Sequence, residues 1–154
     1  YAPAKQCRWT LAMANKKDTN FRWYQEVWIN GRWEQMDEIY RPAADEDCLI
    51  PGATANPEEA REIVTALNCL ISNHKLRIIN VIEEGDWVSA LVEMTGVKAG
   101  TETPVEVRWL TMSRVEDGCI VESYPQVNLL SFFEQLGQLP PHSFELMLGG
   151  SALR

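Results

Sequence analysis

Residues 105–137 decide the fold and read, in order, VEVRWLTMSR, VEDG, CIVESYPQVN and LLSFFEQLG. Over residues 105–113, Val, Trp and Thr alternate with Glu, Arg, Leu and Met, and this period of two is typical of a strand with two unlike faces. Asp117 and Gly118 suit the positive φ angles of a tight hairpin. A second strand over residues 119–124 is expected to stop at Pro125.

A short amphipathic helix follows the hairpin. One apolar helical stripe, with spacing i, i+3, i+4 and i+7, is formed by Leu129, Phe132, Phe133 and Leu136. Gly137 suits the residue that ends such a helix in a left-handed conformation.

The upstream sequence predicts helices first and strands second. A charged turn is expected at residues 15–18, an aromatic-rich helix at 21–29, and a second helix at 32–40. Asn56 and Pro57 are typical of a helix start, and the following helix is expected to be largely buried through Ile71. Strands are expected at 75–83 and 87–97. The order predicts an α+β protein, with a sheet curved around the N-terminal helices and a final helix.

Composition narrows the class of protein. The 154 residues predict a single domain, 1–154, with a core at about 20–140. The net charge of -8 argues against nucleic acid or an anionic membrane as partner, and no apolar run of membrane length occurs. Four scattered cysteines and the lack of a signal-peptide pattern indicate a cytoplasmic protein with reduced thiols.

No cofactor or metal is expected. The sequence lacks a glycine-rich phosphate loop, a dinucleotide fingerprint and a spaced set of Cys or His ligands. Nucleophilic catalysis is also disfavoured, since no histidine is placed to activate Cys119 or Ser123.

The C-terminal half resembles a known family. The order of strand, Asp117-Gly118, strand, Tyr124-Pro125 and a helix ending QLGQLP at residues 135–140 is similar to that of the SnoaL-like polyketide cyclases. These belong to the nuclear transport factor 2-like (ketosteroid isomerase-like) superfamily. The resemblance, over about residues 20–140, implies a cone-shaped α+β barrel with an apolar pocket and often a dimer through the outer sheet face.

The resemblance also implies where acid–base chemistry would lie. The cyclases carry an aspartate at the position of Ser123 and a histidine at that of Thr111, and ketosteroid isomerases carry their base near Ile50. Serine does not titrate near neutral pH and threonine cannot replace an imidazole as a proton carrier. The family's acid–base pair is therefore replaced in this chain.

Three other residues are candidates for catalysis. Glu93 lies between apolar residues on a strand, where burial would raise its pKa; the alternative is pairing with Arg77 or Arg108 on the outer sheet face. Asp37 could reach the pocket mouth or face solvent. Tyr24 could place its hydroxyl near a ligand oxygen or satisfy a backbone carbonyl.

A ligand-binding set completes the hypothesis. Aromatic and polar side chains expected to line the pocket are Trp28, Tyr40, Ile50, Trp109, Thr111 and Ser123. The aromatic members can equally form an ordinary core, because large aromatics dominate burial in a small domain.

Three functions remain open. The first is a cofactor-independent cyclase or isomerase acting on a hydrophobic, polyketide-like carbonyl compound. The second is a protein that binds such a molecule without converting it, and the third is a dimeric interaction module. An ionisable side chain inside the cavity would favour the enzyme, and a cavity far below about 300 Å³ would favour the module.

A homodimer is expected because the outward residues Glu106, Arg108, Leu110 and Met112 form an unusually apolar sheet face.

Overall fold

A computed structural model describes residues 16–41 and 57–152 of the chain. One antiparallel sheet has the strand order β1-β2-β3-β4. Its strands are β1 (Ile71–Glu84), β2 (Trp87–Lys98), β3 (Pro104–Glu116) and β4 (Cys119–Val127). The hairpin between β3 and β4 turns at Asp117 and Gly118, which have φ angles of 48° and 76°, as the sequence predicts.

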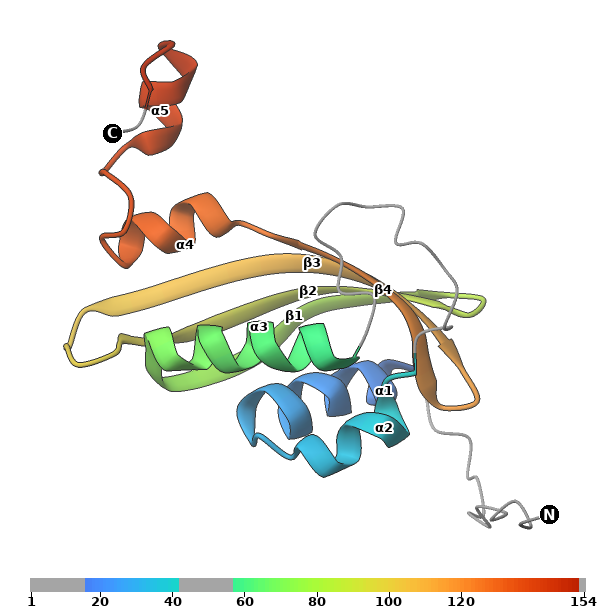
Figure 1. Cartoon of the computed structure of the whole chain (residues 1–154). Coiled ribbons are helices and arrows are strands. Elements are labelled where there is room, and N and C mark those ends of the chain that lie inside the picture. Colours follow the sequence, from blue (N-terminus) through green and yellow to red (C-terminus); the bar gives the residue numbers. More distant parts are fainter. Residues whose placement is uncertain (1–15, 42–56, 153–154) are drawn as a thin grey trace.

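Helices cover one face of the sheet. They precede the strands as α1 (Lys16–Arg22), the π-helix η1 (Trp23–Ile29), the 3-10 helix η2 (Trp33–Gln35), α2 (Met36–Ile39) and α3 (Pro57–Leu70). The chain continues after the sheet with α4 (Leu129–Gln135) and α5 (Ser143–Leu148). In Figure 1, α1, α2 and α3 lie on the same side of the curved sheet. The predicted α+β architecture is confirmed.

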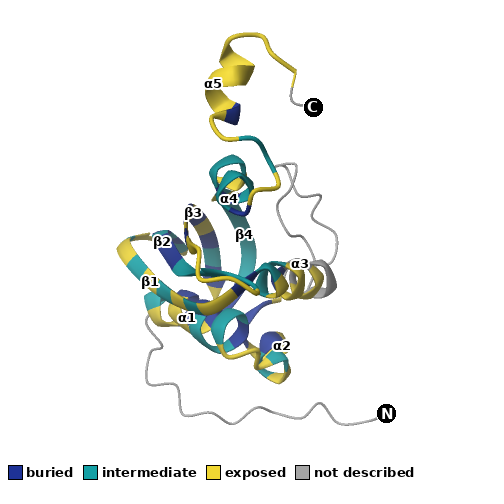
Figure 2. Cartoon of the chain, turned by 90° about the vertical axis from the view of Figure 1, so that its left-hand side faces the viewer, coloured by how far each residue is buried: buried dark blue, intermediate teal, exposed yellow. Residues whose placement is uncertain are grey.

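The core lies between this sheet face and the helices. Along β3, Val105, Val107, Trp109, Thr111 and Ser113 are buried, whereas the residues between them are exposed. The strand alternation read from the sequence is therefore confirmed. Figure 2 shows the same banding of buried and exposed positions along the strands.

Two sequence predictions near the hairpin and the first helix are wrong. Residues 16–18 are the first part of α1 instead of a turn, and Lys16 is bonded to Asp86 at 2.8 Å, which ties the helix start to the β1–β2 turn. Pro125 lies inside β4, paired with Thr111. Because β4 is an edge strand, the missing N–H of a proline interrupts no ladder on its outer side.

The third helix also differs from its prediction. Only Val64 is buried among the side chains described in α3, so this helix is half exposed instead of largely buried. Ile71 is the first residue of β1. Gly96 allows this early start, since a Cβ there would lie 2.5 Å from Ile71 Cγ2 and 2.8 Å from the Ser72 carbonyl oxygen.

The final helices lie beyond the sheet edge. Gln135 of α4 accepts a bond from the Glu106 backbone N–H and donates one to its carbonyl, each at 2.8 Å, so a side-chain amide completes the edge of β3 where β4 has ended. The segment beyond α4 stands away from the body, and α5 is exposed except at its first residue, Ser143.

Candidate functional site

The interior is built by η1 and β3. Seven residues of π-helix place Tyr24 and Trp28 against Trp109 of β3. The Trp28 and Trp109 rings stack with centroids 5.7 Å apart, and Tyr24 meets Trp109 edge-on at 5.6 Å. π-Helical segments are rare and frequently occur at functional sites. Three of the aromatic residues predicted from sequence are thus brought together.

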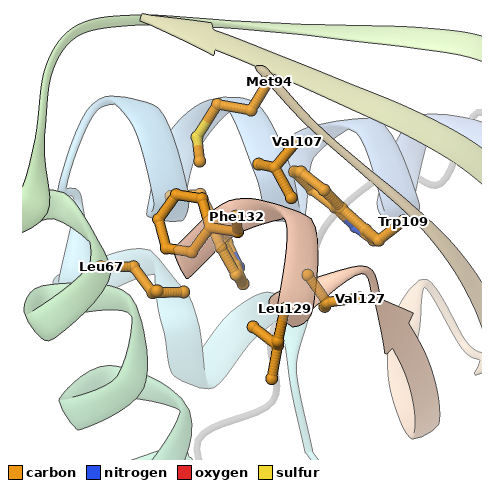
Figure 3. A pocket seen from close by; sticks show the side chains of 8 residues that line it. Leu67, Met94, Val107, Trp109, Val127, Leu129 and Phe132 are labelled. Carbon is orange, nitrogen blue, oxygen red and sulfur yellow. The ribbon is translucent and has the colours of Figure 1, made fainter. Parts of the chain in front are cut away.

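An apolar cavity adjoins this aromatic group. Its wall comes from η1, α3, the inner sheet face and α4 (Figure 3), and consists of Trp28, Leu67, Met94, Val107, Trp109, Val127, Leu129 and Phe132. The cavity volume is about 20 Å³. That volume admits one water-sized sphere, far less than the several hundred cubic ångströms of a typical ligand site.

Tyr24 forms the polar side of the aromatic group. The Trp109 Nε1–H donates a 3.2 Å hydrogen bond to the Tyr24 phenol oxygen, and both residues are buried. Burial raises the pKa of Tyr24 above its usual value of 10.0, and its hydrogen bonds with Trp109 and Thr111 only partly oppose this rise. The phenol therefore stays protonated at neutral pH and can donate.

A row of hydroxyl groups continues from Tyr24 along the inner sheet face. Thr111 Oγ1 lies 3.5 Å from Ser123 Oγ, and Ser113 Oγ lies 3.4 Å from the same oxygen. Asn20 donates from Nδ2 to Ser113 Oγ at 3.2 Å. The two positions implied by the family resemblance, Thr111 and Ser123, therefore meet as neutral groups.

Glu93 lies on the opposite side of the sheet. It is flanked in register by Arg77 of β1 and Arg108 of β3, and its two carboxylate oxygens are 2.6 Å and 2.8 Å from their guanidinium groups. Hydrogen bonding from Arg77 is the main cause that lowers the pKa of Glu93, against a smaller opposing effect of burial. The expectation of a raised pKa is wrong, and the alternative pairing across the outer face is confirmed.

The other predicted residues lie apart from the aromatic group. Asp37 is exposed, and its backbone carbonyl accepts a bond from Arg41. Tyr40 is buried and stacks on Trp23 at 4.7 Å, within the core. Ile50 lies outside the described residues.

Several interior residues escaped the sequence analysis. Ser113 shares strand parity with Thr111, so alternation alone could have identified it. Asn20 comes from α1, and no local pattern relates it to β3. The cavity residues Leu67 and Phe132 come from α3 and α4 and likewise meet only in the folded chain.

The interior offers neutral hydrogen-bonding groups for chemistry. Within the described part of the chain, the buried residues with polar or charged side chains are Thr19, Asn20, Glu93, Thr111, Ser113 and Ser143. Only Glu93 in this set carries a charge, and it belongs to the outer face. Two buried atoms near the site, Asn20 Oδ1 and Trp28 Nε1, have no hydrogen-bond partner, although such groups are normally satisfied in folded proteins.

The described residues contain neither a metal-ligand cluster nor a membrane-spanning helix. Across residues 16–41 and 57–152, no three His, Cys, Asp or Glu side chains converge as metal ligands. The helices of the same residues are all too short or too polar to cross a bilayer.

Helices packed against one face of a curved four-stranded antiparallel sheet, with an aromatic interior, define an α+β protein of the ketosteroid isomerase-like fold. The chain belongs to the SnoaL-like domain family, whose domain matches residues 21–123. No curated protein sequence matches this chain.

Solved structures share the fold. TsrD from Streptomyces laurentii has a TM-score of 0.66 and 18% identity, covering 84% of this chain and 99% of that protein. IdmH from Streptomyces antibioticus, described as "a putative polyketide cyclase", has a TM-score of 0.64 and 23% identity, covering 80% and 99%. A hypothetical protein with a ketosteroid isomerase-like fold from Catenulispora acidiphila, in complex with trimethylamine, has a TM-score of 0.61 and 21% identity, covering 78% of this chain and 92% of that protein. At such identities the likeness concerns the fold.

Proposed function

We propose that this protein binds a hydrophobic small molecule carrying a carbonyl-type oxygen, in the interior between η1, β3 and α4. The observation that carries the proposal is the pair of stacked indoles, Trp28 and Trp109, in the wall of an apolar cavity. The phenol of Tyr24 is hydrogen-bonded to the second indole. Aromatic walls with a few oriented polar groups are typical of small-molecule sites.

Ligand entry requires the cavity to open. At about 20 Å³ it is too small for an organic molecule as it stands. Leu129, in the first turn of α4, lines the cavity and is 46% exposed, so it can move without breaking the core. Binding is therefore expected to displace this turn and change the surroundings of Trp28.

Binding without conversion is the form of the function that the polar groups favour. Ser123 and Thr111 stand where the resemblance implies an acid–base pair, and neither hydroxyl ionises near neutral pH. Glu93 and Asp37, the carboxylates predicted as substitutes, lie on the outer sheet face and at an exposed helix position.

A second candidate is a cofactor-independent cyclase or isomerase. It is favoured by Tyr24, a buried phenol whose pKa is raised by burial. A protonated phenol in a dry site can donate a hydrogen bond to an enolate oxygen and stabilise the charge that develops there. In this candidate Tyr24 acts as the donor, and another group must remove the proton.

A third candidate is a dimeric interaction module. It is favoured by the small cavity and by exposed apolar side chains on the outer sheet face: Ile82 at 64%, Leu110 at 51% and Met112 at 44%. Ile82 and Met112 are both in register with Ser89 of β2, which lies between β1 and β3, and Leu110 lies two residues from Met112 on the same face. The three side chains are called the apolar stripe. A homodimer formed through this stripe on the outer face would leave the interior free to bind a ligand.

A ligand screen tests the main proposal. Flat polycyclic ketones and quinones are titrated while tryptophan fluorescence reports binding, and mass spectrometry of the same samples reports conversion. Trp28→Phe should weaken binding, whereas the matched control Trp87→Phe should not, because Trp87 stacks on Tyr124 at the outer face. Equal effects of the two variants would contradict an interior site, and turnover that depends on Tyr24 would establish the second candidate.

A further inference from the structure

One indole N–H of the cavity-lining residues has no hydrogen-bond partner. Three buried side-chain atoms in the described part of the chain lack a partner, namely Asn20 Oδ1, Trp28 Nε1 and His74 Nδ1. Of these three residues only Trp28 lines the apolar cavity. Trp28 as a whole is half-buried, but its Nε1 is closed off from solvent. Such a donor destabilises the folded protein, because it has lost its bond to water and gained none in return.

The direction of any bond to this atom is fixed by its chemistry. An indole nitrogen carries a proton and has no lone pair to offer, so it can only donate. The other indole of the stacked pair already has a partner, since Trp109 Nε1–H donates to the Tyr24 oxygen at 3.2 Å. Among the cavity-lining side chains of the described residues, Trp28 therefore holds the one uncommitted N–H.

Trp28 is held in place by contacts within the chain. Its ring stacks on Trp109 with an interplanar angle of 24° and meets Tyr24 at a centroid distance of 6.0 Å. Its backbone carbonyl accepts a 3.0 Å bond from Asn68 Nδ2 of α3, next to the cavity residue Leu67. Ring and backbone are both fixed before a ligand arrives, so little ordering of this side chain is needed on binding.

Water is a poor partner for this N–H. The cavity admits one water-sized sphere, and its wall is apolar. An enclosed water typically needs about two to four polar partners, which such a wall does not supply. A carbonyl oxygen needs only a donor, since it has no proton of its own to place. The unpaired N–H and the apolar wall together suit an apolar molecule whose polar group is a bare acceptor.

We propose that the Trp28 indole N–H is the group that recognises the oxygen of the bound molecule. This inference rests on the proposed function and narrows its ligand to ketones, quinones and similar compounds, in preference to hydrocarbons or alcohols of the same shape. The nitrogen is covered in the closed cavity. Because it belongs to a ring that lines this cavity, the opening required for ligand entry takes place beside it, and the ligand oxygen then accepts the bond that the free protein lacks.

The unpaired state can be tested without a ligand by changing one atom. Replacing Trp28 with β-(3-benzothienyl)alanine keeps the fused bicyclic ring and puts sulfur in place of the N–H. This replacement should raise the urea midpoint of unfolding, because it removes an unpaired buried donor. The same replacement of Trp109 should lower the midpoint, since it breaks the bond to Tyr24. Equal lowering at both positions would mean that the Trp28 N–H already has an acceptor, and would overturn the proposal.

The recognition can be tested with two matched probes, 1-tetralone and its hydrocarbon tetralin. Loss of the Trp28 N–H should weaken 1-tetralone binding roughly five- to tenfold, the effect of one hydrogen bond, and leave tetralin binding unchanged. The same replacement of Trp87, which stacks on Tyr124 at the outer face, is the control and should affect neither probe.

NMR reports the same bond directly. The chain has six tryptophans, and the indole proton of Trp28 is assigned by its absence from the spectrum of the replaced protein. This proton should move further downfield with 1-tetralone than with tetralin, because only the ketone accepts a hydrogen bond. Both probes contain the same benzene ring, so the comparison removes the shift caused by the ring itself. Equal shifts with the two probes would contradict the proposed bond.

The outcomes separate the two proposals. Binding of both probes with no effect of the Trp28 replacement, or with equal loss for both, would overturn the role of the N–H and leave the binding function standing. Failure of both probes to bind the unaltered protein would count against the proposed function and against this assignment of its ligand. The unfolding comparison would then still show whether the Trp28 donor is unpaired.

Discussion

The indole nitrogen of Trp109 and the phenol oxygen of Tyr24 are 3.2 Å apart, in a buried hydrogen bond that joins β3 to η1. The same indole lines the apolar cavity with its ring. The Trp109 side chain therefore connects the apolar part of the interior with the buried hydroxyl groups. Its hydrogen-bond partner, Tyr24, can be substituted while the Trp109 ring is left in place.

Removing the Tyr24 hydroxyl should destabilise the protein. Tyr24→Phe leaves a buried indole N–H without its acceptor, which costs about 1–3 kcal/mol of unfolding free energy. Tyr124→Phe is the matched control, since its hydroxyl bonds to Glu122 at a partly exposed site. Urea unfolding should show the larger loss for Tyr24→Phe, and equal losses would mean that the buried bond contributes nothing special.

The raised pKa of Tyr24 predicts a change at alkaline pH. The unfolded chain loses this proton near pH 10.0 and the folded chain only at higher pH, so the stability contributed by Tyr24 is present below about 10.0 and is lost as pH rises through the folded pKa. Absorbance at 295 nm should reveal one late-titrating tyrosine that is absent in Tyr24→Phe. A late component that persists in the variant would assign it to another tyrosine.

The lowered pKa of Glu93 predicts a change at acidic pH. Its carboxylate between Arg77 and Arg108 stabilises the folded state above the usual glutamate pKa of 4.5, and this contribution is lost as pH falls through the lower folded pKa. Glu93→Gln should therefore flatten the acid side of a plot of melting temperature against pH, whereas the exposed Glu102→Gln should not. Ligand binding should be unchanged in Glu93→Gln, and a loss of binding would return Glu93 to the site.

The side chain of Gln135 should stabilise the edge of β3. Gln135→Ala removes both bonds to the Glu106 backbone and should lower the unfolding free energy by about 1 kcal/mol. Gln138→Ala, at an exposed position, is the control. Hydrogen exchange of the Glu106 amide should be faster only in Gln135→Ala, and unchanged exchange would show that the edge is protected by something else.

The outer sheet face should mediate a homodimer. Leu110→Glu places a carboxylate in the apolar stripe and should convert dimer to monomer in sedimentation experiments, because burying an unpaired charge is costly. Phe21→Glu, at an exposed residue of α1, is the control. A concentration-independent monomer for the unaltered protein would remove the prediction.

Much of the fold was determined by local sequence. The period-two pattern of residues 105–113, the Asp117-Gly118 turn and the stripe ending at Leu136 each depend on neighbouring residues, so they could be read without knowledge of the rest. Pro125 was misread because the effect of a proline in a strand depends on whether that strand lies at an edge, and only the sheet order decides this.

The candidate site was determined mainly by tertiary structure. Strand parity placed Trp109, Thr111 and Ser123 on the inner face, and the same parity leaves Glu93 on the outer face. Whether Glu93 is buried alone or paired depends on its register with Arg77 and Arg108, which long-range strand pairing sets. The contact of Asn20 with Ser113 joins residues 93 positions apart. This contact forms only when folding brings α1 against β3, so no local pattern in the sequence could have predicted it.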